Sequence, residues 1–468
     1  MTTAAREFDV IVIGTGSGVA IADSAAAEGL TAAIVESGPF GGTCVNRGCI
    51  PSKQLIHSAD VMEIIDKAAD FGIIAHVDAI DWDKIISRVI SEADDSANTV
   101  ESRYHGNDKV AIYKGEGRFV DFKTMEVNGE RITAPKIMVA AGSRPVVPPI
   151  PGIDGVPYLT SDEALRYDKQ PEKLIVVGGG FVGIELAHFY GALGTDVTIV
   201  QRGPTLLPIE DEDVARRFTD LAKRKYRVIL DAETRSVSHN NGEISLEITT
   251  PSGDQTIIGD TLLLATGRRP NSDRLDLDKT GVQMNARGLV VVDEYLETNV
   301  PGIWALGDVV GRYQLKHNAN WEWWHADHNM FDRGPKAAVN YHAMPHAVFA
   351  SPQIGAVGMT EQQARDEGVP YVLGTYEYAW SAHGIAIGDL TGFVKIIAHA
   401  ETREILGAHI MGTDAATLIQ DIANGMRIGL TTDVYSQGIY VHPAAPEVVY
   451  RAMRSVPGTK FPPMQPNA

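Results

Sequence analysis

The chain has 468 residues, of which 44% are hydrophobic and 22% are charged, and its formal net charge is −19 at pH 7. The length predicts about three domains, and the acidic balance argues against nucleic acid or an anionic membrane as partners. No apolar run is long enough for a membrane span, and two cysteines are too few for a disulfide-scaffolded secreted protein. We therefore expect a cytoplasmic protein without a metal site, in which any anionic ligand needs local cations or helix dipoles.

Residues 8–36 predict a first dinucleotide-binding unit. An apolar strand over 8–13 leads into a glycine-rich loop, an alanine-rich helix and a second strand over 31–35. Such a loop lets the backbone turn sharply and approach a pyrophosphate, which the helix N-terminus then faces. Glu36 follows at the distance of the acid that holds ribose hydroxyls, although Val19 stands where a third glycine is expected. The candidate cofactor residues of this unit are Gly14, Gly16, Gly18 and Glu36.

The segment 41–53, Gly-Gly-Thr-Cys-Val-Asn-Arg-Gly-Cys-Ile-Pro-Ser-Lys, holds both cysteines of the chain. A rare residue placed twice beside a dinucleotide fingerprint predicts a redox-active disulfide between Cys44 and Cys49. Their Cα atoms must then lie within about 7 Å, which requires a distorted helix start that Gly48 permits. A permanent disulfide would close too small a loop to stabilise the fold much, and two unpaired buried thiols are the remaining alternative.

Residues 173–202 predict a second dinucleotide-binding unit, in which all three glycines of the loop are present. The position expected to be acidic is Gln201, and Arg202 follows it. A carboxylate would repel the 2′-phosphate of NADPH and an arginine would pair with it, so this pair favours NADPH over NADH. The alternative is that Arg202 is only a solvated loop charge. The candidate cofactor residues here are Gly178, Gly180, Gly183 and Arg202.

Two further apolar strands, 137–141 and 262–265, resemble each other and fall at equivalent distances along the two units. They lead to Gly142 and Gly267, and this repetition is typical of a duplicated fold. Two dinucleotide sites beside a cysteine pair imply a flavin that is reduced by a nicotinamide.

The segment 302–308 predicts a strand that ends in a turn and presents the carboxylate of Asp308 after Gly307. Asp308 is expected either to cap the N-terminus of a following helix or to hold a hydroxyl of the polyol chain of the flavin cofactor, and both roles are compatible.

Together these motifs resemble those of the class I pyridine nucleotide–disulfide oxidoreductases, the flavoprotein family of glutathione reductase, dihydrolipoamide dehydrogenase, mercuric reductase and mycothione reductase. The resemblance covers nearly the whole chain and includes the segment 442–447, His-Pro-Ala-Ala-Pro-Glu. It implies an α/β fold with two Rossmann-like domains, for FAD and NAD(P), and a C-terminal α+β dimerisation domain. The implied order is a first FAD-binding segment at 1–150, the NAD(P)H-binding domain at 151–270, a second FAD-binding segment at 271–345 and the dimerisation domain at 346–468.

The resemblance also implies roles for single residues. Cys49 is the sulfur next to the flavin and Cys44 is the interchange sulfur. His442, oriented by Glu447, exchanges protons with the thiols from the other subunit of a homodimer. Lys53 pairs with Glu185 beside the reactive edge of the flavin, where a fixed positive charge stabilises the reduced cofactor. The remaining residues implied to contact a cofactor are Gly42, Thr43, Gly142, Gly267, Gly307 and Asp308.

The motifs leave the disulfide substrate open. The chain lacks the further C-terminal cysteine pair of mercuric reductases and the substrate-binding arginine that glutathione reductases carry on the first FAD helix. The opening loop and the segment 313–320, together with the ending 442–449, most resemble those of the reductases of mycothione. Tyr440 replaces a second histidine of dihydrolipoamide dehydrogenases, which use NAD, yet residues 48–53 have a form that those enzymes share.

We therefore expect an NADPH-dependent reductase of a low-molecular-weight thiol disulfide such as mycothione. Dihydrolipoamide dehydrogenase is the alternative, and a flavin-binding subunit without turnover is a distant one. The tryptophans at 321, 323 and 324 fit no family pattern; they are expected to pack a domain interface or to line a pocket.

Overall fold

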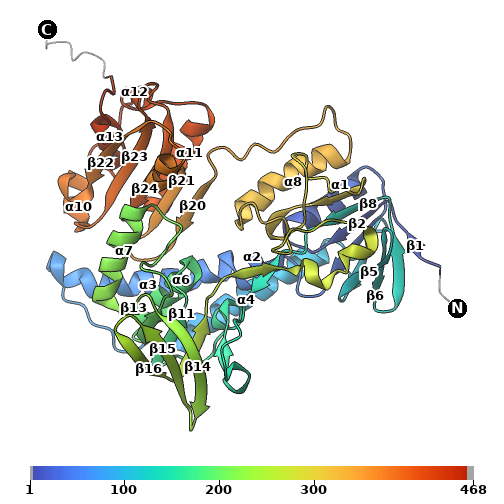
Figure 1. Cartoon of the computed structure of the whole chain (residues 1–468), viewed down its shortest axis with the longest axis horizontal. Coiled ribbons are helices and arrows are strands. Elements are labelled where there is room, and N and C mark those ends of the chain that lie inside the picture. The colour runs from blue at the N-terminus through green and yellow to red at the C-terminus, as the bar shows by residue number, and fades with distance from the viewer. Residues whose placement is uncertain (1–3, 461–468) are drawn as a thin grey trace.

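The computed structural model describes residues 4–460, which form three lobes (Figure 1). The N-terminal lobe contains β2 and β8, the central lobe contains β11 and β14, and the C-terminal lobe contains β20 to β24. The long helix α3 (Cys49–Lys67) runs from the N-terminal lobe along the central lobe, where it packs on α6 (Phe181–Ala192).

A five-stranded parallel sheet forms the centre of the N-terminal lobe, in the order β19-β8-β2-β3-β4. The β2 strand is wholly buried because its four apolar residues face helices or other strands on both sides. Helices α1 (Ala20–Ala27) and α8 (Lys316–Met330) pack together against this sheet. The strands are β2 (Val10–Ile13), β3 (Ala32–Glu36), β4 (Val110–Lys114), β8 (Lys136–Val139) and β19 (Ile303–Ala305).

The central lobe repeats this arrangement in a second five-stranded parallel sheet, in the order β10-β17-β11-β12-β13. The strand β11 lies between β12 and β17, just as β2 lies between β3 and β8 in the N-terminal lobe. The duplication expected from the sequence is therefore present in the topology. The strands are β10 (Tyr158–Leu159), β11 (Lys173–Val177), β12 (Asp196–Val200), β13 (Arg227–Ile229) and β17 (Thr261–Leu264).

Smaller sheets accompany these two. An antiparallel sheet of β14 (Glu233–Asn240), β15 (Glu243–Thr250) and β16 (Gly253–Gly259) extends the central lobe. A four-stranded sheet of β1 (Arg6–Glu7), β7 (Glu130–Thr133), β6 (Thr124–Val127) and β5 (Gly117–Asp121) covers the N-terminal lobe.

The C-terminal lobe is an antiparallel five-stranded sheet in the order β20-β21-β24-β23-β22, with helices packed on it. The expected α/β fold with two dinucleotide-binding units and a C-terminal α+β domain is therefore confirmed. Its elements include β20 (Pro345–Val348), β21 (Ile354–Gly358), β22 (Tyr371–Glu377), β23 (Phe393–His399), β24 (Ile405–Met411), α11 (Ala415–Arg427) and α13 (Pro446–Ser455).

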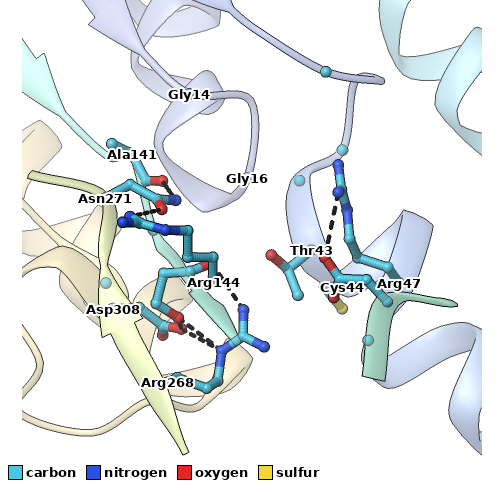
Figure 2. A pocket seen from close by; sticks show the side chains of 18 of the residues that line it. Gly14, Gly16, Thr43, Cys44, Arg47, Ala141, Arg144, Arg268, Asn271 and Asp308 are labelled. Atoms are coloured by element: carbon cyan, nitrogen blue, oxygen red, sulfur yellow. Dashed lines mark hydrogen bonds and ion pairs between the residues drawn. The ribbon is translucent and has the colours of Figure 1, made fainter. Parts of the chain in front are cut away.

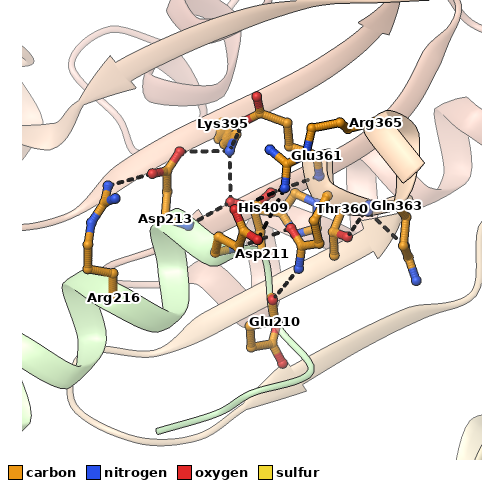
Figure 3. A network of polar contacts seen from close by, with 12 residues as sticks. Glu210, Asp211, Asp213, Arg216, Thr360, Glu361, Gln363, Arg365, Lys395 and His409 are labelled. Atoms are coloured by element: carbon orange, nitrogen blue, oxygen red, sulfur yellow. Dashed lines mark hydrogen bonds and ion pairs between the residues drawn. The ribbon is translucent and has the colours of Figure 1, made fainter. Parts of the chain in front are cut away.

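A buried charge network joins the central and C-terminal lobes (Figure 3). Lys395 of β23 is 1% exposed, and its ammonium lies 2.8 Å from Asp211 and 2.7 Å from Asp213, at the start of α7 (Glu212–Lys225). Glu361 completes the shell around this ammonium at 2.5 Å. A buried cation needs such partners because its desolvation is costly, so this network fixes how the two lobes meet. Within residues 4–460, no helix is both long and apolar enough to cross a membrane.

Candidate active site

A cavity of about 670 Å³ lies where the loop after β2, the cysteine segment and the N-terminus of α8 meet (Figure 2). Its walls bring together residues that are separated by up to about 300 positions in the chain. The sequence-predicted residues that line it are Gly14, Gly16, Glu36, Gly42, Thr43, Cys44, Cys49, Lys53, Gly142, Glu185, Gly307 and Asp308.

The first glycine-rich loop has three glycines with different tasks. Gly14 has φ +95°, and a Cβ there would lie 2.4 Å from the oxygen of Ala140, so the sharp turn needs glycine. At Gly16 a Cβ would meet nothing within 4 Å, which leaves the backbone open to the cavity. Gly18 does not line the cavity; a Cβ there would lie 2.3 Å from the Cβ of Ala140. The chain enters α1 through a short 3-10 turn, and Gly18 allows the close helix–strand contact that the absent third glycine would serve.

Glu36 at the end of β3 closes this loop. One carboxylate oxygen accepts hydrogen bonds from the backbone N–H and the hydroxyl of Thr15, at 2.9 and 2.7 Å, and the other accepts from the N–H of Gly38. A carboxylate has about four acceptor sites, so Glu36 retains capacity for a ribose hydroxyl. The open backbone at Gly16, the acid at the strand end and the cavity volume fit a dinucleotide.

Asp308 lies across the cavity from Cys44 (Figure 2) and does not cap a helix. It sits in a 3-10 turn (Gly307–Val309), and the next α-helix, α8, begins only at Lys316 with Leu315 as its N-cap. The N-cap expectation was therefore wrong. The carboxylate of Asp308 instead accepts a 2.5 Å hydrogen bond from the hydroxyl of Ser143 and faces the cavity.

The two cysteines lie on consecutive helices that break at Gly48. Cys44 is on α2 (Gly42–Arg47), and Cys49 is the first residue of α3. Gly48 has φ −148° and ψ −121°, and a Cβ there would lie 2.8 Å from the carbonyl oxygen of Thr43. The break at this glycine brings the two side chains into hydrogen-bond contact as thiols, the reduced form of the predicted pair.

The surroundings of the two sulfurs shift the pKa values of Cys44 and Cys49 in opposite directions. The hydrogen bond from Cys44 lowers the pKa of Cys49 to about 6, and the charge of Lys53 adds to this effect against the opposing effect of burial. The position of Cys49 at a helix N-terminus favours a thiolate in the same sense. For Cys44 the hydrogen bond to Cys49 and burial raise the pKa. Cys49 is therefore the sulfur that holds a resting negative charge.

Lys53 and Glu185 form an ion pair between α3 and α6. The ammonium lies 2.7 and 2.9 Å from the two carboxylate oxygens. Glu185 is 5% exposed and also accepts from the N–H of Phe349, at 2.9 Å. Since removing a charge from water is costly unless it is paired, the pair holds both side chains in place at the cavity wall.

His442 and Glu447 form a second pair, at the C-terminal end of the chain. The Nδ1 of His442 lies 2.9 Å from a carboxylate oxygen of Glu447 at the start of α13, and the imidazole side chain is 70% exposed. His442 is not among the residues that line the cavity of its own chain.

The second glycine-rich loop repeats the first. Gly178 has φ +113°, and its carbonyl oxygen would lie 2.2 Å from a Cβ placed at Gly183. Gly180 is open and precedes α6, whose N-terminus has no side-chain cap. Gln201 corresponds to Glu36 of the first unit, because its side-chain oxygen accepts a hydrogen bond from the N–H of Gly179 at 3.0 Å.

Arg202 and Gly267 lie outside the cavity. Arg202 is exposed, and no carboxylate of residues 4–460 forms an ion pair with it. Gly267 has φ +115° and precedes β18 (Arg268–Pro270), which pairs with β9 (Ser143–Pro145).

The three tryptophans of α8 have different surroundings. Trp323 packs against the core of the N-terminal lobe. The ring of Trp321 carries the guanidinium of Arg427 at 4.6 Å, a contact between the N-terminal and C-terminal lobes. Trp324 is 58% exposed. The expectation of packing at a domain interface therefore holds for Trp321, whereas Trp323 packs within one lobe.

Part of the cavity wall was not predicted from the sequence. The guanidinium of Arg268 donates to the hydroxyl and carbonyl of Ser143, each at 2.8 Å, behind Asp308 (Figure 2). Lys316, Arg47 and Arg144 also line the cavity and supply cations for an anionic ligand. The repeated Gly-Ser-Arg-Pro and Gly-Arg-Arg-Pro segments carried the signal, since each follows a strand of one of the two parallel sheets, and their residues form β9 and β18, which pair with each other.

Comparisons with known proteins agree with this architecture. Residues 8–322 match the family model described as pyridine nucleotide-disulphide oxidoreductase, and residues 344–453 match the model of its dimerisation domain. The chain therefore belongs to the class I pyridine nucleotide–disulfide oxidoreductases. It is an FAD-dependent disulfide oxidoreductase that uses a pyridine nucleotide, and its dimerisation domain supports a homodimer.

Individual relatives cover nearly the whole chain. The mycothione reductase of Mycobacterium tuberculosis is 39% identical over 457 residues, which are 95% of this chain and 98% of the relative. The dihydrolipoyl dehydrogenase of Geobacillus stearothermophilus is 34% identical and covers 97% of each chain. Among solved structures, the HOCl-induced flavoprotein disulfide reductase RclA from Escherichia coli superposes with a TM-score of 0.85 at 28% identity, over 96% of this chain and 99% of its own.

Proposed function

We propose that this protein reduces a low-molecular-weight thiol disulfide, mycothione or a close relative of it, with electrons from NADPH. The observation that carries the proposal is the contact between Cys44 and Cys49 at the wall of the dinucleotide cavity, with Cys49 as the more acidic thiol. In the net reaction, one NADPH and one proton convert a disulfide into two thiols and NADP⁺.

FAD bound in the cavity would transfer two electrons from NADPH to the Cys44–Cys49 disulfide. Cys44 then acts as a thiolate that attacks one sulfur of the substrate disulfide, whose S–S bond breaks and releases a first thiolate. Cys49 attacks the sulfur of Cys44 in the resulting mixed disulfide, which releases the second thiolate and restores the pair. The thiolate of Cys49 suits this step because it holds its charge at neutral pH.

His442 of the partner subunit is assigned as the group that moves protons to and from these thiols. In support, its Nδ1 is held by Glu447, which leaves Nε2 free to exchange a proton. The loop around it carries Ile439 and Val441, 102% and 75% exposed, an apolar surface suited to burial in a dimer.

The preference for NADPH is supported at the second loop. Gln201 makes the bond to the loop that Glu36 makes in the first unit, but it brings no negative charge. Arg202 is exposed beside it and available to a 2′-phosphate.

The assignment of mycothione rests on the higher identity to the mycobacterial reductase than to the dihydrolipoyl dehydrogenases. Tyr440, which stands where those enzymes are expected to have a histidine, stacks on Tyr450 with ring centroids 4.6 Å apart and donates to the carbonyl of Tyr435. Its hydroxyl is thus engaged within its own lobe.

The proposal is tested by two steady-state assays on the same purified holoenzyme, NADPH with mycothione and NAD⁺ with dihydrolipoamide. Faster turnover in the first assay supports the proposal. Faster NADH production in the second overturns it and places the enzyme with the dihydrolipoamide dehydrogenases. Absence of both activities in a protein that binds FAD would favour a non-catalytic flavin-binding subunit.

A further inference from the structure

Lys316 occupies an unfavourable position for a lysine. It is the first residue of α8, a 15-residue helix with no acidic residue in its first turn and no side-chain cap. The positive end of a helix dipole disfavours a cation there. A residue that breaks a local rule in this way points to a role at a site.

The Lys316 side chain is held on the cavity wall by a hydrogen-bond chain. Its ammonium donates to the hydroxyl of Ser17 at 2.8 Å, and that hydroxyl donates to the side-chain oxygen of Asn320, also at 2.8 Å. Ser17 belongs to the loop after β2, and Asn320 lies one turn along α8. The chain of bonds restrains a side chain that is otherwise free to rotate.

The same loop supports the helix that carries Cys44. A Cβ at Gly42 would lie 2.9 Å from the Cα of Gly16, so the N-terminus of α2 rests directly on the loop. Cys44 is two residues beyond Gly42, and Ser17 is one residue beyond Gly16. Lys316 and Cys44 therefore approach the same part of the cavity from two sides.

We infer that the ammonium of Lys316 stabilises the thiolate of Cys44 and so prepares this sulfur for attack on the substrate disulfide. The inference rests on the proposed role of Cys44 as the interchange thiol. Cys49 on α3 and the burial of the sulfur act against ionisation of Cys44, and the charge of Lys316 acts for it. Lys53 lies in an ion pair with Glu185 beside Cys49, and its charge acts on that sulfur.

The effect is confined to one step. The Cys44 thiolate gives an electron pair to one substrate sulfur, a new S–S bond forms, the substrate S–S bond breaks, and the leaving thiolate takes a proton. A cation beside the attacking sulfur increases the fraction of Cys44 that is ionised before this step.

The test measures Cys44 directly and needs neither nicotinamide nor substrate. Holoenzyme is reduced with a phosphine and desalted under argon, and the rate of iodoacetamide reaction at Cys44 is followed against pH by peptide mass spectrometry. Lys316→Met should raise the midpoint pH of this reaction by about 1 unit, as expected for loss of a nearby cation. The reaction at pH 7 should then be about 10-fold slower.

Two variants make the result specific. Lys316→Arg keeps the charge and should keep the midpoint near that of the wild type. Arg312→Met removes a cation four residues earlier, whose guanidinium lies over the ring of Tyr341, and should leave the midpoint unchanged. An unchanged midpoint in Lys316→Met overturns the inference, and so does loss of FAD from that variant, which would make Lys316 a flavin ligand. Neither outcome depends on which disulfide or nicotinamide the enzyme uses.

Discussion

At Cys49 a thiol receives a hydrogen bond from Cys44, lies one helical turn from Lys53 and begins a 19-residue helix. Each of these features stabilises negative charge on the sulfur. Burial raises the pKa of Cys49, but the other effects together are larger, so this pKa falls to about 6. The thiolate of Cys49 is thus present throughout the neutral range, whereas Cys44 remains protonated until another group assists it.

Cys44→Ala should raise the pKa of Cys49 above 6 by about 1 unit or more, because a hydrogen bond to a charged acceptor is lost. The measurement is the pH dependence of thiolate absorbance in the ultraviolet, which then reports on a single cysteine. Cys44→Ser keeps a hydroxyl donor and should shift the pKa less. Equal shifts in both variants would show that the hydrogen bond does not lower the pKa of Cys49.

Arg202→Glu should change the choice of nicotinamide. A carboxylate there would repel the 2′-phosphate, so the ratio of kcat/KM for NADPH to that for NADH should fall about 10-fold or more. Arg224, exposed on α7, offers a matched control; Arg224→Glu makes the same change of charge elsewhere in the lobe. An unchanged ratio in Arg202→Glu would mean that other residues recognise the phosphate.

Among the elements, the break between α2 and α3 sets the distance between the cysteines. A Cβ at Gly48 would lie 2.8 Å from the carbonyl oxygen of Thr43, so a side chain would push the two helices apart. Both cysteines lie on helices, and α6 supports α3 through the Lys53–Glu185 pair. The two cysteines are therefore positioned by the helices that carry them and not by a loop.

Gly48→Ala should destabilise the fold by about 1–3 kcal/mol, as overpacking does, and should lower disulfide turnover. Thermal unfolding and the steady-state assay measure the two effects. Gly155→Ala is the control, because a Cβ there would meet nothing within 4 Å. If Gly48→Ala behaved like Gly155→Ala, the glycine would not be needed for the break.

The sequence patterns predicted these elements unequally well. Apolar strands that end in glycine loops identified both parallel sheets, because a buried strand and a sharp turn each restrict residue type. The task of Gly18 could not be predicted, since it depends on the position of Ala140, which follows β8 about 120 residues away. The wall behind Asp308 was missed for the same reason, because it requires β9 to pair with β18. The domain boundaries and the roles of the site residues stay predictions.

Across the whole molecule, Glu63 stands where the three lobes meet. It lies on α3, and its carboxylate accepts from Lys225 at the end of α7 and from Ser351 between β20 and β21. Burial opposes its ionisation, but the charge and hydrogen bond of Lys225, with Ser351 and His188, lower its pKa to about 2. The ionised form therefore stabilises the assembled lobes.

The contribution of Glu63 to stability should depend on pH. Its folded pKa is below the ordinary value of 4.5, so the contribution is complete above pH 4.5 and is lost as the pH falls toward 2. Glu63→Gln should be less stable than the wild type at pH 7, and the difference in the free energy of unfolding should shrink below pH 4.5. Denaturant unfolding at several pH values measures it, and a constant difference would contradict the assignment.

The exposed imidazole of His442 lies outside the cavity of its own chain, and this position has a consequence for how two mutant alleles act together. If each site takes Cys44 from one subunit and His442 from the other, a Cys44→Ser subunit paired with a His442→Gln subunit contains one intact site. Random reassociation of the two inactive proteins should then restore about one quarter of wild-type turnover. A chain with both substitutions would behave oppositely, because every dimer it forms with a wild-type chain loses both sites. One defective allele would thus suppress a healthy one, while two different defective alleles would complement each other.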